Sequence, residues 1–247
     1  MLLLQVIIAV SVLLGLFILS LVLKIFDSKG SVAALVLGAW VAFLGSDAWL
    51  ILMVLFAASS YVATRAFFRK KRAINLQEGS TGERGPSNIL FAGIIGAAIA
   101  LFYYLSQVFR DPGFPYFELF AISFAVINAD TFASELGSLD RKVYMITTFK
   151  KTVPGANGGV SLTGTAASGL GGFLIGIFFV YLNNGYFLVW PVVFITAMGT
   201  LGSAVDSVLG DRLENRNIIG KGMVNFLASL VTVSAAVLLL LTFPVLG

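Results

Sequence analysis

The chain has 247 residues, of which 58% are apolar and only 11% are charged. Soluble domains usually carry about 25% charged residues, and the mean hydropathy of +0.97 also indicates a membrane protein. A chain this apolar uses lipid as its solvent, and its length suits one transmembrane domain, residues 1–247. Cysteine and histidine are absent, which excludes disulfides, thiol nucleophiles, serine–histidine triads and zinc sites built from those residues.

Eight apolar segments have a length and composition that suit membrane-spanning helices. The first is predicted to be a span rather than a cleavable signal, because its apolar run is too long and lacks a basic start. The second and third are short and could form a tight hairpin or a partly re-entrant segment, so seven spans are also possible. We therefore predict an all-α, polytopic transmembrane helical bundle. The segments cover roughly residues 2–23, 30–45, 47–64, 87–108, 115–136, 159–182, 187–210 and 222–245.

The basic residues predict the orientation of this bundle. With eight spans, every basic residue except Arg110 falls on one side. Positive charge marks the cytoplasmic side, so both termini are expected outside. The main polar linker, residues 65–86, is interpreted as a solvated cytoplasmic loop, although its basic cluster could also contact anionic headgroups or a phosphorylated substrate. The net charge of +4 is spread over such loops and does not predict nucleic-acid binding.

Residues 127–140, INADTFASELGSLD, place carboxylates next to the membrane. A carboxylate there is costly, so it should face a polar cavity or a partner. Asp130 and Ser134 share one helical face, whereas Asp130 and Glu135 are about 140° apart on an ideal helix. Both acids could reach one ion only if the helix bends or ends, for which Gly137 is suited. The alternative is a cytoplasmic helix end with solvated acids.

The segment PGANGG, residues 154–159, is predicted to form a turn that leads directly into the sixth apolar segment. Glycines let backbone N–H groups approach an anion closely, and a helix N-terminus favours negative charge. Lys150 and Lys151 flank the turn, so its composition suits phosphate binding by Asn157, Gly158 and Gly159. The Walker spacing is absent, and a plain tight turn before a helix is an equal alternative.

Small residues recur at every fourth position inside the sixth segment, at Gly164, Ser168, Gly172 and Gly176. Such a stripe allows another helix to approach closely. We therefore interpret it as a packing surface rather than a ligand site.

The seventh segment contains Asp206 about one turn inside its apolar boundary, with small residues on either side. An acid in that position is a candidate functional residue, whereas Asp211 and Glu214 are interpreted as ordinary loop acids. The fourth and eighth segments begin with Asn88 and Asn225 close to their starts, where asparagine could act as a helix N-cap.

The predicted topology brings these scattered residues to one membrane face. The fourth, sixth and eighth segments start on the cytoplasmic side, and the fifth and seventh end there. A transporter site would instead be expected near the midplane. Acids, amides, a glycine-rich turn and basic loops at one face suit a Mg²⁺-bound phosphorylated substrate, whose lipid tail could lie between helices. The residues gathered in this way are Asn88, Asp130, Glu135, Asn157, Asp206 and Asn225.

Three ordered motifs resemble a family of integral membrane proteins long known only as a domain of unknown function. The motifs are NADTFASELG (128–137), VPGANGGVS (153–161) and GSAVDSVLG (202–210), and Asn225 looks like a fourth matching position. The family includes the plant phytyl-phosphate kinase of the vitamin E pathway and a human transmembrane protein. It is distantly similar to CTP-dependent polyprenol kinases and phosphatidate cytidylyltransferases. Gly155-Ala156 departs from the family pattern, and Asn88 matches only loosely.

The resemblance implies a nucleotide-dependent kinase, with CTP as the expected donor and an isoprenoid monophosphate, such as phytyl or geranylgeranyl phosphate, as the acceptor. Mg²⁺ would bind Asp130 and Asp206, with Glu135 as a further ligand or orienting residue. A lipid-phosphate cytidylyltransferase and a transporter or flippase are the alternatives, and an oligomer is possible. The residues expected to contact substrate or nucleotide are Asn88, Lys150, Lys151, Asn157, Gly158, Gly159 and Asn225.

Overall fold

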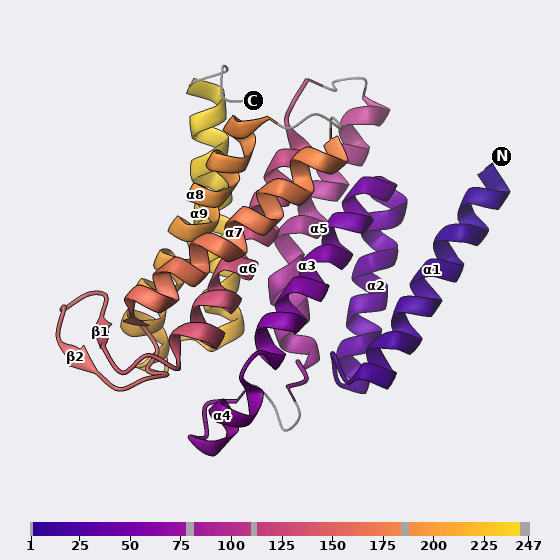
Figure 1. Cartoon of the computed structure of the whole chain (residues 1–247). Helices are drawn as coiled ribbons and strands as arrows, with labels where there is room; N and C mark the ends of the chain where they lie inside the picture. Colours follow the sequence, from indigo (N-terminus) through magenta and orange to yellow (C-terminus); the bar gives the residue numbers. More distant parts are fainter. Residues whose placement is uncertain (1, 78–81, 110–112, 184–187, 243–247) are drawn as a thin grey trace.

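A computed structural model describes residues 2–77, 82–109, 113–183 and 188–242. It shows long helices at the eight predicted segments, so the prediction of an all-α helical bundle is confirmed (Figure 1). The α-helices are α1 (Leu2–Leu23), α2 (Ser28–Leu44), α3 (Asp47–Arg65), α4 (Phe68–Ala73), α5 (Pro86–Val108), α6 (Tyr116–Gly137), α7 (Leu162–Asn183), α8 (Val189–Leu209) and α9 (Lys221–Thr242). The remaining elements are β1 (Val143–Met145), β2 (Lys151–Thr152), β3 (Gly159–Val160) and the π-helical turn η1 (Gly210–Glu214).

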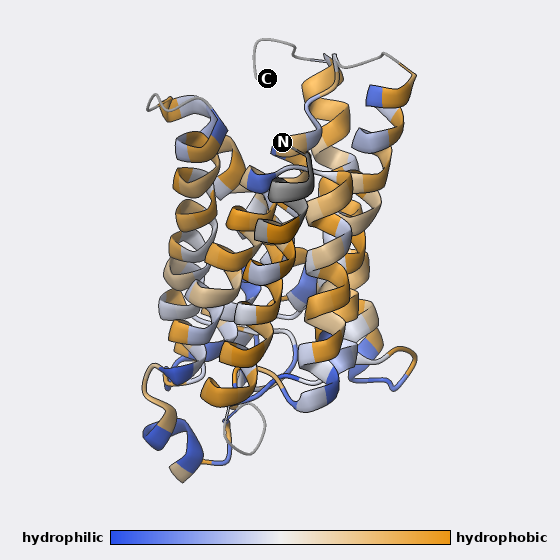
Figure 2. Cartoon of the chain, turned by 90° about the vertical axis from the view of Figure 1, so that its right-hand side faces the viewer, coloured by the Kyte–Doolittle hydropathy of each residue, from blue (hydrophilic) through white to orange (hydrophobic). Residues whose placement is uncertain are grey.

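Six of the described helices are long and apolar enough to cross a bilayer, namely α3, α5, α6, α7, α8 with η1, and α9. Two further apolar stretches, Ala9–Leu23 within α1 and Ser28–Leu44 in α2, are shorter. The count of eight spans, the seven-span alternative and the outward-facing termini therefore stay predictions. Hydrophilic residues gather at the end of the bundle that carries α4, the strands and η1, which we call the polar end (Figure 2).

Helix α6 lies at the centre of the bundle. In its membrane-crossing window 78% of the residues are buried, whereas the other five long helices bury 44% or less. It packs against α3, α5, α7, α8 and α9. Polar side chains on α6 therefore face protein or an internal cavity rather than lipid, and each needs a polar partner there.

Asn128 in α6 joins three helices through its fully buried amide group. Its Nδ2 donates a hydrogen bond to the backbone oxygen of Gly171 in α7, at 2.8 Å. Its Oδ1 accepts hydrogen bonds from Ser59 and Ser60 of α3, at 3.1 and 2.9 Å. Both ends of the amide are thus satisfied, and the residue fixes the positions of α3 and α7 relative to α6.

The stripe of small residues in α7 is a packing surface at Gly172 and Gly176, as predicted, whereas Gly164 and Ser168 also line a cavity at the polar end. A Cβ atom on either Gly172 or Gly176 would lie 3.0 Å from a backbone oxygen of α8. At the polar end Gly164 meets Gly137 of α6, where a Cβ on Gly137 would lie 2.8 Å from the Gly164 Cα. Only glycine permits these approaches, so the ends of α6, α7 and α8 converge closely.

A buried ion pair attaches α4 to the bundle. Lys71 is completely buried, and its Nζ contacts the carboxylate of Glu135 in α6. The same ammonium group donates a hydrogen bond to the Thr64 backbone oxygen at 2.7 Å. The interpretation of residues 65–86 as a solvated loop is therefore wrong for Lys71, because the short helix α4 turns this side chain inward.

The linker between α6 and α7 forms a small antiparallel sheet that the sequence did not predict. Its strand order is β2-β1-β3, with Val143 opposite Thr152 and Met145 opposite Gly159. The glycine-rich turn therefore connects β2 to β3 and does not lead directly into α7. Backbone pairing with β1 explains the difference, since it continues through Gly159 and Val160 before the helix begins.

Breaking the ion pair between α4 and α6 should be costly, because each single substitution leaves a buried charge without its partner. We expect Lys71→Met and Glu135→Met each to lower the free energy of unfolding by about 3 kcal/mol. The double variant should be more stable than either single variant. Denaturant unfolding in detergent micelles measures these values, with the exposed Lys70→Met as the matched control. A double variant as unstable as the sum of the single changes would contradict coupling of the two side chains.

Candidate functional site

A polar cavity of about 290 Å³ opens at the polar end, among α6, α7, α8, η1 and the start of α9. It is bordered by the glycine-rich turn between β2 and β3. Small and hydroxyl-bearing residues dominate its wall, which leaves space and provides oxygen atoms that can accept hydrogen bonds. The hydroxyl-bearing residues are Ser134, Ser138, Ser161, Thr165, Ser168, Thr200, Ser203 and Ser207.

Two carboxyl groups meet in this cavity. Asp130 comes from α6 and Asp206 from α8, and their half-buried side chains are close enough to share a hydrogen bond. Two carboxylates this close repel each other unless a proton or a cation lies between them. The structure therefore brings together the two residues that the sequence singled out for metal binding, and the pair is suited to hold a cation.

Charged residues surround this carboxylate pair. Lys221, the first residue of α9, lines the cavity and interacts electrostatically with both Asp130 and Asp206. Arg84 also acts on Asp130, from outside the cavity lining, and its Nη2 donates a hydrogen bond to Thr131 Oγ1 at 3.3 Å. Cationic groups beside the pair compensate part of its negative charge and could also attract a phosphate group.

A third acid reaches the cavity through the π-helical turn η1. Glu214 lines the cavity and lies close enough to affect both members of the carboxylate pair. The interpretation of Glu214 as an ordinary loop acid is therefore wrong. The widened turn continues α8 beyond Leu209 and places Glu214 next to the site, as such turns often do at functional sites.

The glycine-rich turn packs directly on η1. A Cβ atom on Gly158, whose φ is +79°, would lie 2.5 Å from the Cβ of Asp211. Asn215 Nδ2 donates a hydrogen bond to the Asn157 backbone oxygen at 3.1 Å, and Thr147 donates one to the Asp211 carboxylate. These contacts hold the turn and the neighbouring β1–β2 loop against η1, and Asn157, Gly158 and Gly159 line the rim of the cavity.

Other predicted site residues lie elsewhere. Glu135 is bound to Lys71 and does not line the polar cavity. Lys150 and Lys151 are exposed and also lie outside the cavity lining. The structure thus separates these three residues from the carboxylate pair.

The two asparagines are not N-caps. Helix α5 has Gly85 as its N-cap, so Asn88 lies within the first turn, and Asn225 lies a full turn inside α9. Asn88 lines a second cavity. Asn225 is buried, and its Oδ1 accepts no hydrogen bond within the described part of the chain. Neither asparagine lines the polar cavity.

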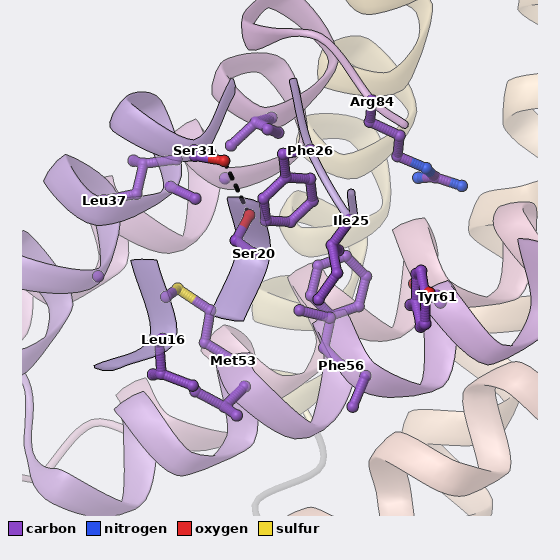
Figure 3. Close-up of a pocket in the computed structure, with 18 of the residues that line it drawn as sticks. Leu16, Ser20, Ile25, Phe26, Ser31, Leu37, Met53, Phe56, Tyr61 and Arg84 are labelled. Atoms are coloured by element: carbon purple, nitrogen blue, oxygen red, sulfur yellow. Dashed lines mark hydrogen bonds between the residues drawn. The ribbon is translucent and has the colours of Figure 1, made fainter. Parts of the chain in front are cut away.

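The second cavity has a volume of about 210 Å³ and lies among α1, α2, α3 and α5 (Figure 3). Its wall is mostly apolar, with Leu37, Met53 and Phe56 among the labelled side chains. Arg84 lines this apolar cavity and also contacts the α6 residues next to the polar cavity. The two cavities therefore share a neighbour, which could not be inferred from the spacing of the motifs.

The donor atoms of the polar cavity fit Mg²⁺. The described residues include no group of three or more acidic side chains placed to hold a metal. Mg²⁺ is usually bound by one or two carboxylates, with water and substrate phosphates as the other ligands. Asp130 and Asp206 supply that number of carboxylates, and the surrounding hydroxyl groups can bind the metal's water molecules.

Comparisons with known proteins agree with this membrane architecture. The family model described as "Integral membrane protein DUF92" matches residues 11–241. An uncharacterized membrane protein of Methanocaldococcus jannaschii is 30% identical over 209 residues, which cover 83% of this chain and 82% of that protein. An uncharacterized membrane protein of Synechocystis is 29% identical over 221 residues, covering 85% and 82%. The chloroplastic protein VTE6 of Arabidopsis thaliana is 30% identical over 156 residues, covering 60% of this chain and 45% of VTE6. No solved structure matches. The chain belongs to the DUF92 family of integral membrane proteins.

Proposed function

We propose that this protein is a membrane-embedded, Mg²⁺-dependent kinase that converts an isoprenoid monophosphate into its diphosphate. The observation that carries the proposal is the Asp130–Asp206 pair in a hydroxyl-rich cavity, with Lys221 beside it. The motif resemblance to the family of the plant phytyl-phosphate kinase supports this reaction, and similarity to VTE6 is consistent with it. CTP is the expected phosphoryl donor, and the polar end is expected to face the cytoplasm.

The reaction needs positioning and charge neutralisation more than a dedicated nucleophile. An oxygen of the acceptor monophosphate attacks the terminal phosphorus of the donor. The bond from that phosphorus to its bridging oxygen breaks, and the nucleoside diphosphate leaves. The acceptor oxygen already carries negative charge at neutral pH, so it does not have to lose a proton to a protein base.

Each group in the cavity has a role in this reaction. Asp130 and Asp206 would hold Mg²⁺, which supplies charge neutralisation on the donor phosphates when bound. Lys221 would bind a phosphate oxygen. The turn at Asn157 and Gly158 borders the same space and can present backbone N–H groups to the nucleotide.

Removing either charge of the carboxylate pair should abolish most activity, because the metal would lose half of its protein carboxylates. We expect Asp130→Asn and Asp206→Asn each to lower kcat/KM by about 100-fold or more. The assay contains purified protein in nanodiscs, geranylgeranyl or phytyl phosphate, Mg²⁺ and each nucleoside triphosphate in turn. Mn²⁺ binding, measured by electron paramagnetic resonance, should weaken in the same two variants.

Asp47→Asn is the matched control, since Asp47 is exposed at the start of α3, at the opposite end of the bundle. The kinase proposal fails if no nucleotide yields the prenyl diphosphate in the wild-type assay. Release of pyrophosphate together with a nucleotide-linked lipid would indicate a cytidylyltransferase instead. Movement of unmodified substrate across proteoliposomes would indicate a transporter.

The position of Lys221 favours it over Lys150 and Lys151 for binding phosphate, because only Lys221 lines the polar cavity. We expect Lys221→Gln to raise the KM for the nucleotide about tenfold, the usual effect of losing a hydrogen bond to a charged group. Lys221→Arg should retain part of the affinity.

Lys150→Gln and Lys151→Gln serve as matched controls and should change the nucleotide KM less than twofold, about the effect of an exposed charge. The measurement is steady-state kinetics at saturating acceptor. A large KM increase in these two variants, with Lys221→Gln near wild type, would assign phosphate binding to the hairpin lysines instead.

A further inference from the structure

The apolar cavity has a wall that is chemically suited to hydrocarbon. Its lining comes from α1, α2, α3 and α5 and includes Leu13, Leu37 and Met53. Ser20 and Ser31 also line it, but their hydroxyl groups are hydrogen-bonded to each other at 2.8 Å (Figure 3). Because these hydroxyls satisfy each other, the wall offers a ligand mainly dispersion contacts and burial of apolar surface.

One part of the cavity carries a positive charge. Arg84 lines it, and Figure 3 shows this side chain at its edge, on the same side as Tyr61. The Arg84 backbone is fixed, because its N–H donates to the Ile25 oxygen at 3.3 Å and its oxygen accepts from the Asp27 N–H at 3.2 Å. The backbone at Arg84 is thus anchored to the loop between α1 and α2, which fixes where its side chain begins.

The same guanidinium group lies near Asp130, one member of the carboxylate pair. Arg84 Nη2 contacts Thr131, the residue after Asp130 in α6, and Arg84 acts electrostatically on Asp130 itself. A ligand with an anionic head at Arg84 would therefore have its head next to the polar cavity. Its apolar part would lie among α1, α2, α3 and α5.

We propose that the apolar cavity binds the isoprenoid chain of the acceptor, and that Arg84 binds the acceptor's phosphate. This inference rests on the proposed function and assigns acceptor and donor to different cavities. The charge at one edge of an apolar wall matches an amphiphile with an anionic head. At about 210 Å³ the cavity is smaller than the roughly 300 Å³ at which ligand pockets begin. It therefore holds the part of the chain next to the phosphate, while the remainder lies among membrane lipids.

The test measures equilibrium binding to purified protein in nanodiscs, without nucleotide, so that it does not depend on catalysis. The probes are geranylgeranyl phosphate, geranylgeraniol and dimethylallyl phosphate, which has a single isoprene unit. Ala34→Leu and Ala57→Leu add bulk to the cavity wall and should weaken geranylgeranyl phosphate binding about fivefold. They should weaken dimethylallyl phosphate binding less, because its single isoprene unit fills only part of the cavity. Val36→Leu, at an exposed position of α2 outside the cavity, should leave all three affinities unchanged.

Arg84→Gln tests the head-group half of the proposal. This variant should weaken the binding of both phosphate probes about tenfold and leave the binding of geranylgeraniol unchanged, since only the phosphate probes carry a negative charge. Arg84→Lys should recover part of that loss. Thermal unfolding of each variant establishes that it is folded before binding is measured.

The outcomes separate this proposal from the proposed function. If Ala34→Leu and Ala57→Leu weaken binding of the long-chain probes and the wild-type protein forms no diphosphate, the cavity assignment is supported and the kinase proposal is contradicted. If the wild-type protein forms the diphosphate but Ala34→Leu and Ala57→Leu bind geranylgeranyl phosphate as the wild type does, the cavity assignment is overturned. Equal weakening of geranylgeraniol and the phosphates by Arg84→Gln would overturn the role of Arg84.

Discussion

The close approach of α6 and α7 is the constraint on which the candidate site depends. Gly137 and Gly164 meet with no room for a side chain, and the Asn128 amide joins the same two helices about two helical turns further in. Helix α8 packs just as closely on α7, through Gly172. A wider spacing at any of these contacts would move Asp206 away from Asp130, because the two acids come from α8 and α6 and face each other across this packed group.

The acids of the bundle differ in how their charge is compensated. Glu135 is matched by Lys71, which is fully buried and held by a second hydrogen bond to α3. Such a closed pair leaves little capacity for a ligand, and its evident effect is to fix α4. The Asp130–Asp206 pair instead opens onto a cavity, and the positive charge of Lys221 lies beside it in the cavity wall. An open pair of this kind retains free lone pairs, which a metal and its phosphates can use.

The helices and the meeting of Asp130 with Asp206 were predictable because they depend on local patterns: apolar length, small-residue spacing and acids near the ends of spans. The topology predicts that both acids lie at the same end of the bundle, because α6 and α8 end on the same side. Three features depend on tertiary contacts and left no such pattern. In the sequence, Lys71 is one of several charges in a basic cluster, and nothing marks it as buried. Glu214 lies at the site because of the π-helical turn. The position of Arg84 depends on backbone hydrogen bonds with the α1–α2 loop. The sheet between α6 and α7 is likewise too short to leave an alternating pattern.

The contrast between the two cavities limits how a phosphoryl transfer could occur in this fold. A nucleotide is too polar for the wall around Leu37 and Met53, whereas the polar cavity offers its phosphates a lysine and the carboxylate pair that could hold a cation. Donor and acceptor would therefore enter from different sides of α6, and their phosphates would meet where both sides come together. Arg84 and Thr131 lie on one side of that point and Lys221 on the other, with Asp130 interacting with both cations. In the proposed reaction Asp130 is thus the residue that both substrates share, whereas Asp206 belongs to the donor side alone.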